Sequence, residues 1–331
     1  MRIDTSMVRG ESGGSEVALK RTALAWLATV FAALGAFLLM VIVVDPYDSG
    51  RFPTFMPSGS ADERPPTINV SRGRDPRFNA VLLGSSRAVL ADPRRISALT
   101  GYRFVQLASE GALVPEQMTF LHWFARNHAS VDAIVVATDM IWCDLNPELP
   151  GERDFPYGLY ADNNFEYLRT TLSGATFDFA KERMLYALGR MPGVDHARFV
   201  DIETKYGWRW PDWVPNWYAP KGAAVTTLPA LTRFDADLKE LPTQPPIVLW
   251  MPPYFHDALP SADSPDGLRL AECKAALRRW ADARPHTRFL DLAVDTPEAA
   301  DRRNFLEPIH VSNRFMRVIE VQIAAAVNQV K

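Results

Sequence analysis

The sequence has little cysteine and no excess of charge of one sign, and both shortages exclude classes of protein. Its 36 basic and 39 acidic residues give a formal net charge of -3 over 331 residues, which leaves no basic stripe for nucleic acid. Cys143 and Cys273 are too few for a disulfide framework and match no metal-ligand spacing. We therefore expect no metal site and two separately buried thiols, with one long-range disulfide as the alternative in an oxidising compartment.

One long hydrophobic run lies near the N-terminus. From Thr22 to Val44 the chain carries no charge, and a helix of that length covers about 34 Å, enough to cross a bilayer. The run ends in bulky β-branched residues rather than a small-residue cleavage site, which favours an uncleaved anchor over a signal peptide. Lys20 and Arg21 precede the run and Asp45 follows it, so the N-terminus is expected in the cytoplasm and the C-terminal domain outside it.

These signals divide the chain into four parts. We expect a cytoplasmic tail at 1–21, a transmembrane anchor at 22–44, a linker or strap at 45–78 and an extracytoplasmic domain at 79–331. In a Gram-negative cell the protein would be held in the inner membrane with its domain in the periplasm. Apolar residues make up 47% of the chain, which leaves ample material for a buried core.

The outer domain alternates short apolar runs with longer helical patterns. The runs typical of buried strands are Ala80–Leu83, Phe104–Leu107, Ala133–Ala137, Ile247–Met251 and Arg288–Leu292. The helical patterns are Arg87–Leu99, Val114–Asn127, Gly267–Ala283 and Val311–Val330. This alternation predicts an α/β fold of three layers, in which helices cover both faces of a parallel sheet.

A segment at about 150–241 breaks this alternation and is interpreted as an insertion between the third and fourth strands. Its pattern predicts helices near Asn163–Leu172 and Phe177–Leu188, and it contains a segment rich in tryptophan. The tryptophans are at positions 208, 210, 213 and 217. We interpret the insertion as a lid, whose tryptophans are either buried or form a platform for sugar rings.

Two segments carry residues suited to nucleophilic chemistry. Ser85 and Ser86 follow Gly84 at the end of the first strand, where open parallel sheets bind ligands and a helix start offers N–H groups to an oxyanion. Glu307 precedes His310 by one proline turn, so its carboxylate can hold Nδ1–H and leave Nε2 free to deprotonate a serine. The alternatives are helix capping by serine and a polar turn with a capping histidine.

With both segments in place, the chain resembles the SGNH/GDSL hydrolases, whose blocks are Gly-Asp-Ser after the first strand and Asp-x-x-His before the last helix. The Gly-Ser-Ser variant on an anchored domain is similar to the cell-envelope branch, the D-alanyl-lipoteichoic acid (DltD-like) and exopolysaccharide O-acetylation proteins. The resemblance implies a flavodoxin-like topology and chemistry without a cofactor. It makes Ser86 the nucleophile, His310 the base and Glu307 the acid that orients it.

The two remaining family blocks are matched unequally. Gly111 fits the second block, and its N–H would join that of Ser86 in an oxyanion hole. In the third block Asp139 replaces the family's asparagine donor. An ionised carboxylate would repel an oxyanion, so Asp139 must turn away, be protonated or bind something else.

Four side chains are candidate substrate contacts: Ser85, Arg87, Asp139 and His256. Arg87 could neutralise an acidic group of the substrate or pair with a neighbour such as Glu110. His256 follows the fourth strand, so it is expected on the same rim as Ser86, as a substrate contact or as a structural histidine.

Two functions fit these features. The first is an anchored serine esterase or O-acyltransferase that moves a short acyl group from an ester of an envelope or exported polysaccharide to water or a glycan hydroxyl. Its partners would be the acylated glycan or acyl donor and, as the resemblance implies, a multi-pass membrane O-acyltransferase. The second is a non-catalytic glycan-binding or scaffold protein of a polysaccharide modification complex, which the missing asparagine favours.

Overall fold

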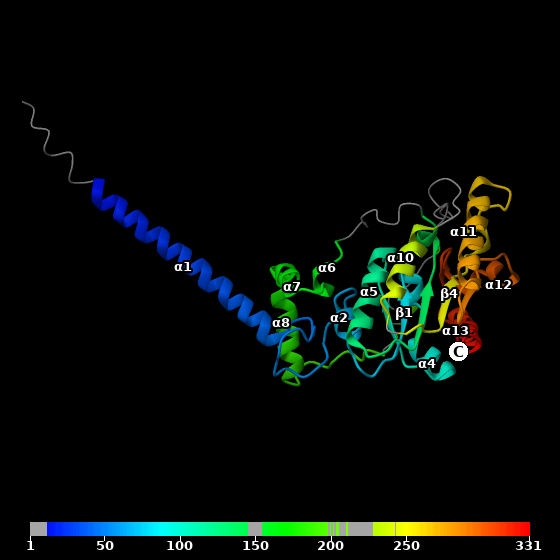
Figure 1. The fold of residues 1–331 in the computed structure, drawn as a ribbon, viewed down its shortest axis with the longest axis horizontal. Helices are drawn as coiled ribbons and strands as arrows, with labels where there is room; N and C mark the ends of the chain where they lie inside the picture. Colours follow the sequence, from blue (N-terminus) through cyan, green and yellow to red (C-terminus); the bar gives the residue numbers. More distant parts are fainter. Residues whose placement is uncertain are drawn as a thin grey trace, which may run out of the picture.

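The computed structural model describes residues 12–144, 154–197, 199, 201, 203–204, 210, 228–241 and 243–331. A long helix, α1 (Ser12–Val44), projects away from an α/β domain that contains most of the other elements (Figure 1). Its part Glu16–Val44 is long and apolar enough to span a membrane. This helix fits a single-pass anchor, as the sequence predicts.

Five strands form one sheet in which each neighbouring pair is parallel. They are β1 (Ala80–Gly84), β2 (Phe104–Ala108), β3 (Ala133–Ala137), β4 (Ile247–Met251) and β5 (Thr287–Asp291). Their order is β2-β1-β3-β4-β5, which is the order of flavodoxin-type doubly wound sheets. The predicted α/β class with a parallel sheet is confirmed, and every strand lies within one residue of its expected limits.

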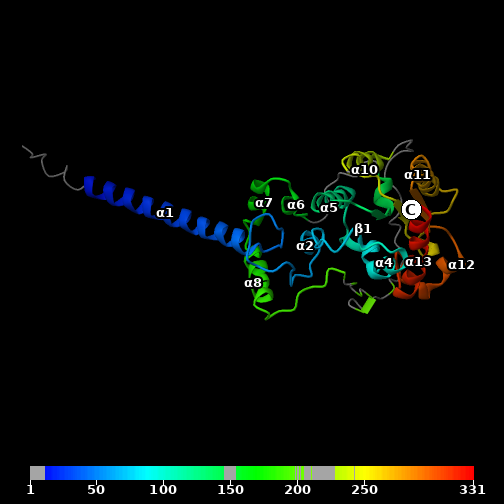
Figure 2. The ribbon, with the colours of Figure 1, turned by 60° about the horizontal axis from the view of Figure 1, so that its bottom comes forward.

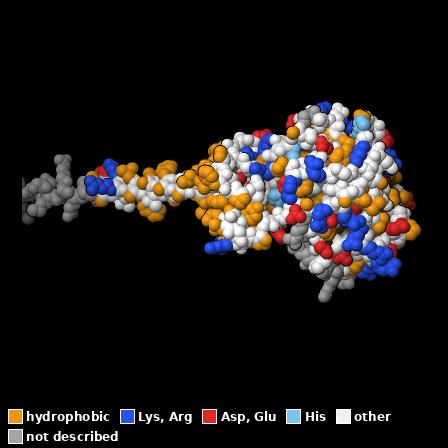
Figure 3. All heavy atoms as spheres, turned by 90° about the horizontal axis from the view of Figure 1, so that it is seen from below, with side chains coloured by type: hydrophobic (Ala, Val, Ile, Leu, Met, Phe, Trp, Pro, Cys, Tyr) orange, Lys and Arg blue, Asp and Glu red, His pale blue; other side chains and the backbone are white. Residues whose placement is uncertain are grey.

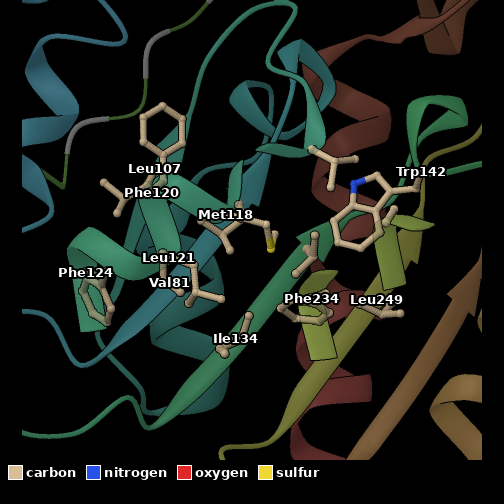
Figure 4. Close-up of a cluster of buried hydrophobic side chains, with 14 of the residues drawn as sticks. Val81, Leu107, Met118, Phe120, Leu121, Phe124, Ile134, Trp142, Phe234 and Leu249 are labelled. Atoms are coloured by element: carbon tan, nitrogen blue, oxygen red, sulfur yellow. The ribbon is translucent and has the colours of Figure 1, made fainter. Parts of the chain in front are cut away.

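Helices cover both faces of this sheet (Figure 2). One face packs against α5 (Val114–Asn127), α10 (Pro229–Lys239) and α11 (Pro265–Asp282), and the other packs against α4 (Pro93–Thr100) and α13 (Asn313–Gln329). The side chains of a strand alternate between the two faces, so Val81 joins the cluster under α5 while Leu82 joins the opposite one (Figure 4). Burial on both faces explains why the strands read as continuous apolar runs.

The helix predicted at Arg87–Leu99 is wrong, because the chain forms two helices there. They are α3 (Ser86–Val89) and α4, and the break falls at Asp92 and Pro93. The Asp92 carboxylate accepts from the Arg94 N–H at 2.9 Å and caps α4, while Pro93 occupies its first turn, where a proline needs no N–H partner. Helix α10 was not predicted from the sequence.

The remaining elements are short or lie outside the sheet. They are α2 (Ile68–Arg72), α6 (Tyr157–Tyr160), α7 (Asn164–Thr171), α8 (Ala175–Ala187), α12 (Pro297–Ala300), β6 (Phe305–Glu307), β7 (His310–Val311) and the 3₁₀ turns Met140–Cys143, His256–Ala258 and Arg302–Asn304. The helices expected near Asn163–Leu172 and Phe177–Leu188 correspond to α7 and α8. The segment at 45–78 packs against the domain as a strap, since all five residues of α2 are buried.

A polar cluster ties the end of α1 to the strap and to α8. The Asp48 carboxylate lies 2.8 Å from both Arg74 and Arg183, and Arg183 is 1% exposed. The Ser71 hydroxyl donates to the same carboxylate at 2.6 Å. Burial raises the pKa of Asp48, and the nearby guanidinium of Arg183 limits that rise. Breaking one partner of such a pair would leave a buried charge uncompensated, so the cluster holds α1 firmly on the domain.

The two cysteines form a disulfide, so the prediction of separately buried thiols is wrong. Cys143 ends the 3₁₀ turn after β3 and Cys273 lies on α11, with Cα atoms 5.5 Å apart across a sequence separation of 130. Both residues belong to the core between the sheet and its helices. Sequence spacing could not bring them together, because only the helix packing against this face places Cys273 over the end of β3.

Removing this bridge is expected to destabilise the domain. In a Cys143→Ala/Cys273→Ala variant the unfolded chain gains conformational entropy, because no disulfide closes its long loop. The free energy of unfolding should fall by about 3–5 kcal/mol. Thermal and urea unfolding of the purified full-length variant and of the wild type, both without reductant, measure the change. An unchanged midpoint, or two reactive thiols in the denatured but unreduced wild type, would contradict the expectation.

Candidate active site

A glycine at the end of β1 sets the position of Ser86. Gly84 has φ +151°, and a Cβ there would lie 2.6 Å from the Cβ of Ala88 and 2.8 Å from that of Ala137. Only glycine fits such a close approach of two chain segments. The turn puts Ser86 at the start of α3, partly exposed, at the carboxyl end of a strand flanked on both sides.

A short hairpin brings His310 to Ser86. Strands β6 and β7 are antiparallel, with Glu307 opposite His310. The Nε2 atom of His310 lies 2.8 Å from the Ser86 Oγ, and its Nδ1 atom contacts the Glu307 carboxylate. Since a carboxylate only accepts, Nδ1 carries the proton and Nε2 is the free acceptor for the serine hydroxyl. The structure thus joins three predicted residues in one hydrogen-bonded chain.

Arg87 fixes this hairpin to the rim of the sheet. Its Nε donates to the Ile309 carbonyl at 3.0 Å, and its Nη2 donates to the Pro253 carbonyl at 2.5 Å. The guanidinium also lies 3.7 Å from the ring centre of Tyr254. Arg87 is 4% exposed, so its donors are directed into the protein rather than toward the expected acidic substrate group. These contacts, rather than the alternative ion pair with Glu110, orient the Arg87 side chain.

Asp139 turns toward Ser85. The Ser85 hydroxyl donates to one carboxylate oxygen, and the other accepts from the Ile141 N–H at 3.4 Å, where it caps the 3₁₀ turn Met140–Cys143. Burial raises the pKa of Asp139, while the bond from Ser85 and the nearby charge of Arg87 oppose the rise. The sequence leaves three outcomes for this carboxyl: it turns away, is protonated or binds another group. The structure shows it bound to the hydroxyl of Ser85.

Gly111 follows β2 and His256 follows β4, two strands that β1 and β3 separate in the sheet. The Gly111 loop approaches the end of β1, because the Ser109 N–H donates to the Gly84 carbonyl at 3.4 Å, and Gly111 itself has φ +65°. The His256 side chain is 40% exposed and lies 3.0 Å from Asp257. An oxyanion role for Gly111 and a substrate contact for His256 stay predictions.

Two aromatic residues near the site were not singled out for it. Tyr254 lies three residues after the end of β4 and is fully buried, and that burial raises its pKa to about 12. Trp210 packs its ring 4.9 Å from that of Phe255, whose N–H donates to the Pro308 carbonyl of the hairpin at 2.9 Å. The run of apolar residues after β4 is a sequence signal for the first, but nothing in the sequence places Trp210.

Described parts of the 150–241 segment contact the start of α13, which follows the hairpin. The Glu203 carboxylate accepts from the Asn313 N–H at 2.7 Å, and Asp201 accepts from its side-chain amide at 2.6 Å. These contacts lie three residues from His310. The interpretation of the segment as a lid stays a prediction, and the tryptophans at 208, 213 and 217 fall outside the described residues. Within the described ranges, no group of three or more His, Cys, Asp or Glu residues could hold a metal ion.

Replacing Arg87 with methionine should loosen the hairpin. Methionine keeps much of the buried volume but leaves the carbonyls of Ile309 and Pro253 without their donor, at a cost of about 2–4 kcal/mol. Chemical denaturation gives the free energy of unfolding. The matched control is Arg303→Met, whose side chain is 79% exposed in a surface ion pair, with an expected change within about 0.5 kcal/mol. Equal losses in both variants would refute the positioning role.

Comparisons with known proteins add little to this geometry. No protein-family model matches the chain, and neither does any curated protein. Among solved structures, the chain is similar to a gut microbial diltiazem-metabolizing enzyme at 12% identity and a TM-score of 0.38. The similarity covers 77% of this chain and 47% of that one, so the chain spans less than half of the other protein's length.

Proposed function

We propose that this protein is a membrane-anchored serine esterase or O-acyltransferase of the SGNH type, acting on acyl esters of cell-envelope or exported polysaccharide. One observation carries the proposal: the chain of contacts from the Glu307 carboxylate through His310 to the Ser86 hydroxyl. In this chain the Oγ of Ser86 lies 2.8 Å from the Nε2 of His310. Such a chain is the arrangement that activates a weak oxygen nucleophile.

The mechanism follows from the direction of these hydrogen bonds. Ser86 Oγ attacks the ester carbonyl carbon while its proton passes to His310 Nε2, and Glu307 stabilises the resulting imidazolium through Nδ1. The tetrahedral intermediate expels the alcohol, which takes the proton from Nε2 and leaves an acyl group on Ser86. Water or a sugar hydroxyl then gives its proton to Nε2 and attacks the acyl carbon. The second tetrahedral intermediate expels Ser86 Oγ, which takes the proton back from Nε2.

The oxyanion needs donors, and the candidates are the backbone N–H groups of Ser86 and Gly111. Because Asp139 is engaged with Ser85, its carboxylate does not have to face the developing charge. The hole would then rest on two donors instead of three, and each absent donor costs about 100–1000-fold in rate. We therefore expect a slow enzyme, or one that is fast only with a natural substrate whose further contacts compensate for the missing donor.

The proposed location is the outer face of the cytoplasmic membrane, with the N-terminus inside. Two observations support it. The Cys143–Cys273 bridge suits an oxidising compartment, and Lys20 and Arg21 lie at the expected cytoplasmic end of α1. A multi-pass O-acyltransferase in the same membrane would be the natural source of acyl groups if a glycan hydroxyl is the acceptor.

Substitution of Ser86 tests the nucleophile. Ser86→Ala should abolish labelling by a fluorophosphonate probe and lower the hydrolysis of p-nitrophenyl acetate by about 1000-fold or more, with a similar loss in His310→Ala. Glu307→Gln should retain the fold but lose most of the activity, because the amide no longer holds the Nδ1–H tautomer. The purified full-length protein in detergent serves for all variants.

Ser85→Ala is the matched control, since Ser85 is the neighbouring hydroxyl and is bound to Asp139. It should still be labelled by the probe. Labelling that survives Ser86→Ala but not Ser85→Ala would move the nucleophile to Ser85. If the wild type binds acylated glycan but neither reacts with the probe nor cleaves the ester, the protein is the glycan-binding or scaffold protein instead.

A further inference from the structure

An apolar face lies exposed on α7 and α8, next to the point where α1 enters the domain (Figure 3). Its side chains are between 43% and 72% exposed: Phe165, Leu172, Phe177, Met184 and Leu188. We call these five residues the α7–α8 apolar face. Single exposed apolar residues are ordinary, but a group of this kind on one surface marks an interaction site.

This face continues the apolar surface of α1. The ring of Phe177 lies 5.0 Å from that of Phe37 in an edge-to-face contact, and α1 contacts both α7 and α8. Close to this contact α1 exposes further apolar side chains, including Leu34 at 39% and Leu39 at 61%. One unbroken apolar surface therefore runs from the membrane-spanning helix onto the domain.

The length of α1 sets the depth of this surface. Residues Glu16–Val44 span about 43 Å, whereas the hydrocarbon core of a bilayer is about 30 Å thick. If Lys20 and Arg21 mark its inner boundary, the core ends about 20 residues later, close to Val41. Phe37 then lies within the hydrocarbon, and Phe177 beside it lies at the same depth.

The strap places a further apolar side chain near the outer end of α1. The Thr54 hydroxyl donates to the Val43 carbonyl at 2.6 Å, so the neighbouring Phe55 is held beside the outer end of α1. Phe55 is fully exposed. A fully exposed aromatic ring at this height is typical of the membrane interface.

The face cannot swing away from the bilayer. Asp45 accepts from the Tyr167 hydroxyl of α7 at 3.2 Å, Asp48 pairs with Arg183 of α8, and the Tyr47 hydroxyl lies 3.0 Å from that of Thr176. These bonds join the residues directly after α1 to α7 and α8, and α1 itself contacts both helices. Any orientation of α1 across the membrane therefore fixes the height of the apolar face.

We propose that the α7–α8 apolar face, with Phe55, is immersed in the outer leaflet, so that the domain rests on the bilayer instead of hanging from a free tether. The occupant is lipid, since the face is continuous with α1 and at the depth of its acyl chains. Two exposed cations, Lys181 on α8 and Arg190 just after it, have side chains long enough to reach lipid phosphates. The proposal rests on α1 crossing the membrane and is independent of catalysis by Ser86.

Site-specific fluorescence in liposomes tests the proposal. Leu188→Cys and, separately, Phe165→Cys are introduced into the full chain, labelled with the environment-sensitive dye NBD and reconstituted in phosphatidylcholine and phosphatidylglycerol vesicles. The native cysteines are bridged and do not compete for the label. The control is Leu268→Cys on α11, which is 56% exposed and lies on the domain away from α1. Ester hydrolysis by each labelled variant is recorded separately.

Lipid contact predicts blue-shifted NBD emission at both α7–α8 positions, with quenching by doxyl-labelled lipids several-fold stronger than at Leu268 and quenching by aqueous iodide several-fold weaker. Iodide quenching equal to the control at both positions would overturn the proposal. Shielding from iodide without quenching by the spin-labelled lipids would also overturn it, because a second copy of the chain would then cover the face. Neither result depends on whether the protein is an esterase.

Discussion

The organisation of the rim depends on the Arg87 guanidinium. From one position after Ser86 it reaches the carbonyls of two segments 166 and 222 residues further along the chain. These bonds are buried, where unpaired donors and acceptors cost the most, so each of the three segments stabilises the position of the others. The distance between the Ser86 hydroxyl and the His310 imidazole is therefore set by an interaction in which neither residue takes part.

Asp139 contributes to the rim through both of its carboxylate oxygens. One accepts from the Ile141 N–H, and the other accepts from the Ser85 hydroxyl in the turn after the first strand. Burial raises its pKa and Arg87 lowers it, so the same arginine that holds the hairpin also reduces the cost of burying this carboxyl. Structural and electrostatic roles converge on one side chain.

Local sequence signals were enough for the sheet, the membrane-spanning helix and the residues that meet at the rim. Apolar runs such as Ala80–Leu83 predict strands, and the rule that parallel strands carry ligands at their carboxyl ends places Ser86. Three features depended on long-range packing and could not be predicted: the Cys143–Cys273 bridge, the inward direction of Arg87 and the place of Trp210. The break between α3 and α4 was missed although Pro93 signalled it, because apolar periodicity was weighted above a helix-breaking residue.

The Cys143–Cys273 bridge closes a ring that contains the segment at 150–241, while Ser86 precedes the ring and His310 follows it. A protease that cuts the backbone once inside that ring opens the main chain but leaves the two pieces covalently linked. The serine and the histidine would then belong to different polypeptides of a single molecule. A single cut in this segment would therefore leave the histidine-bearing half attached, through the disulfide, to the half that carries α1.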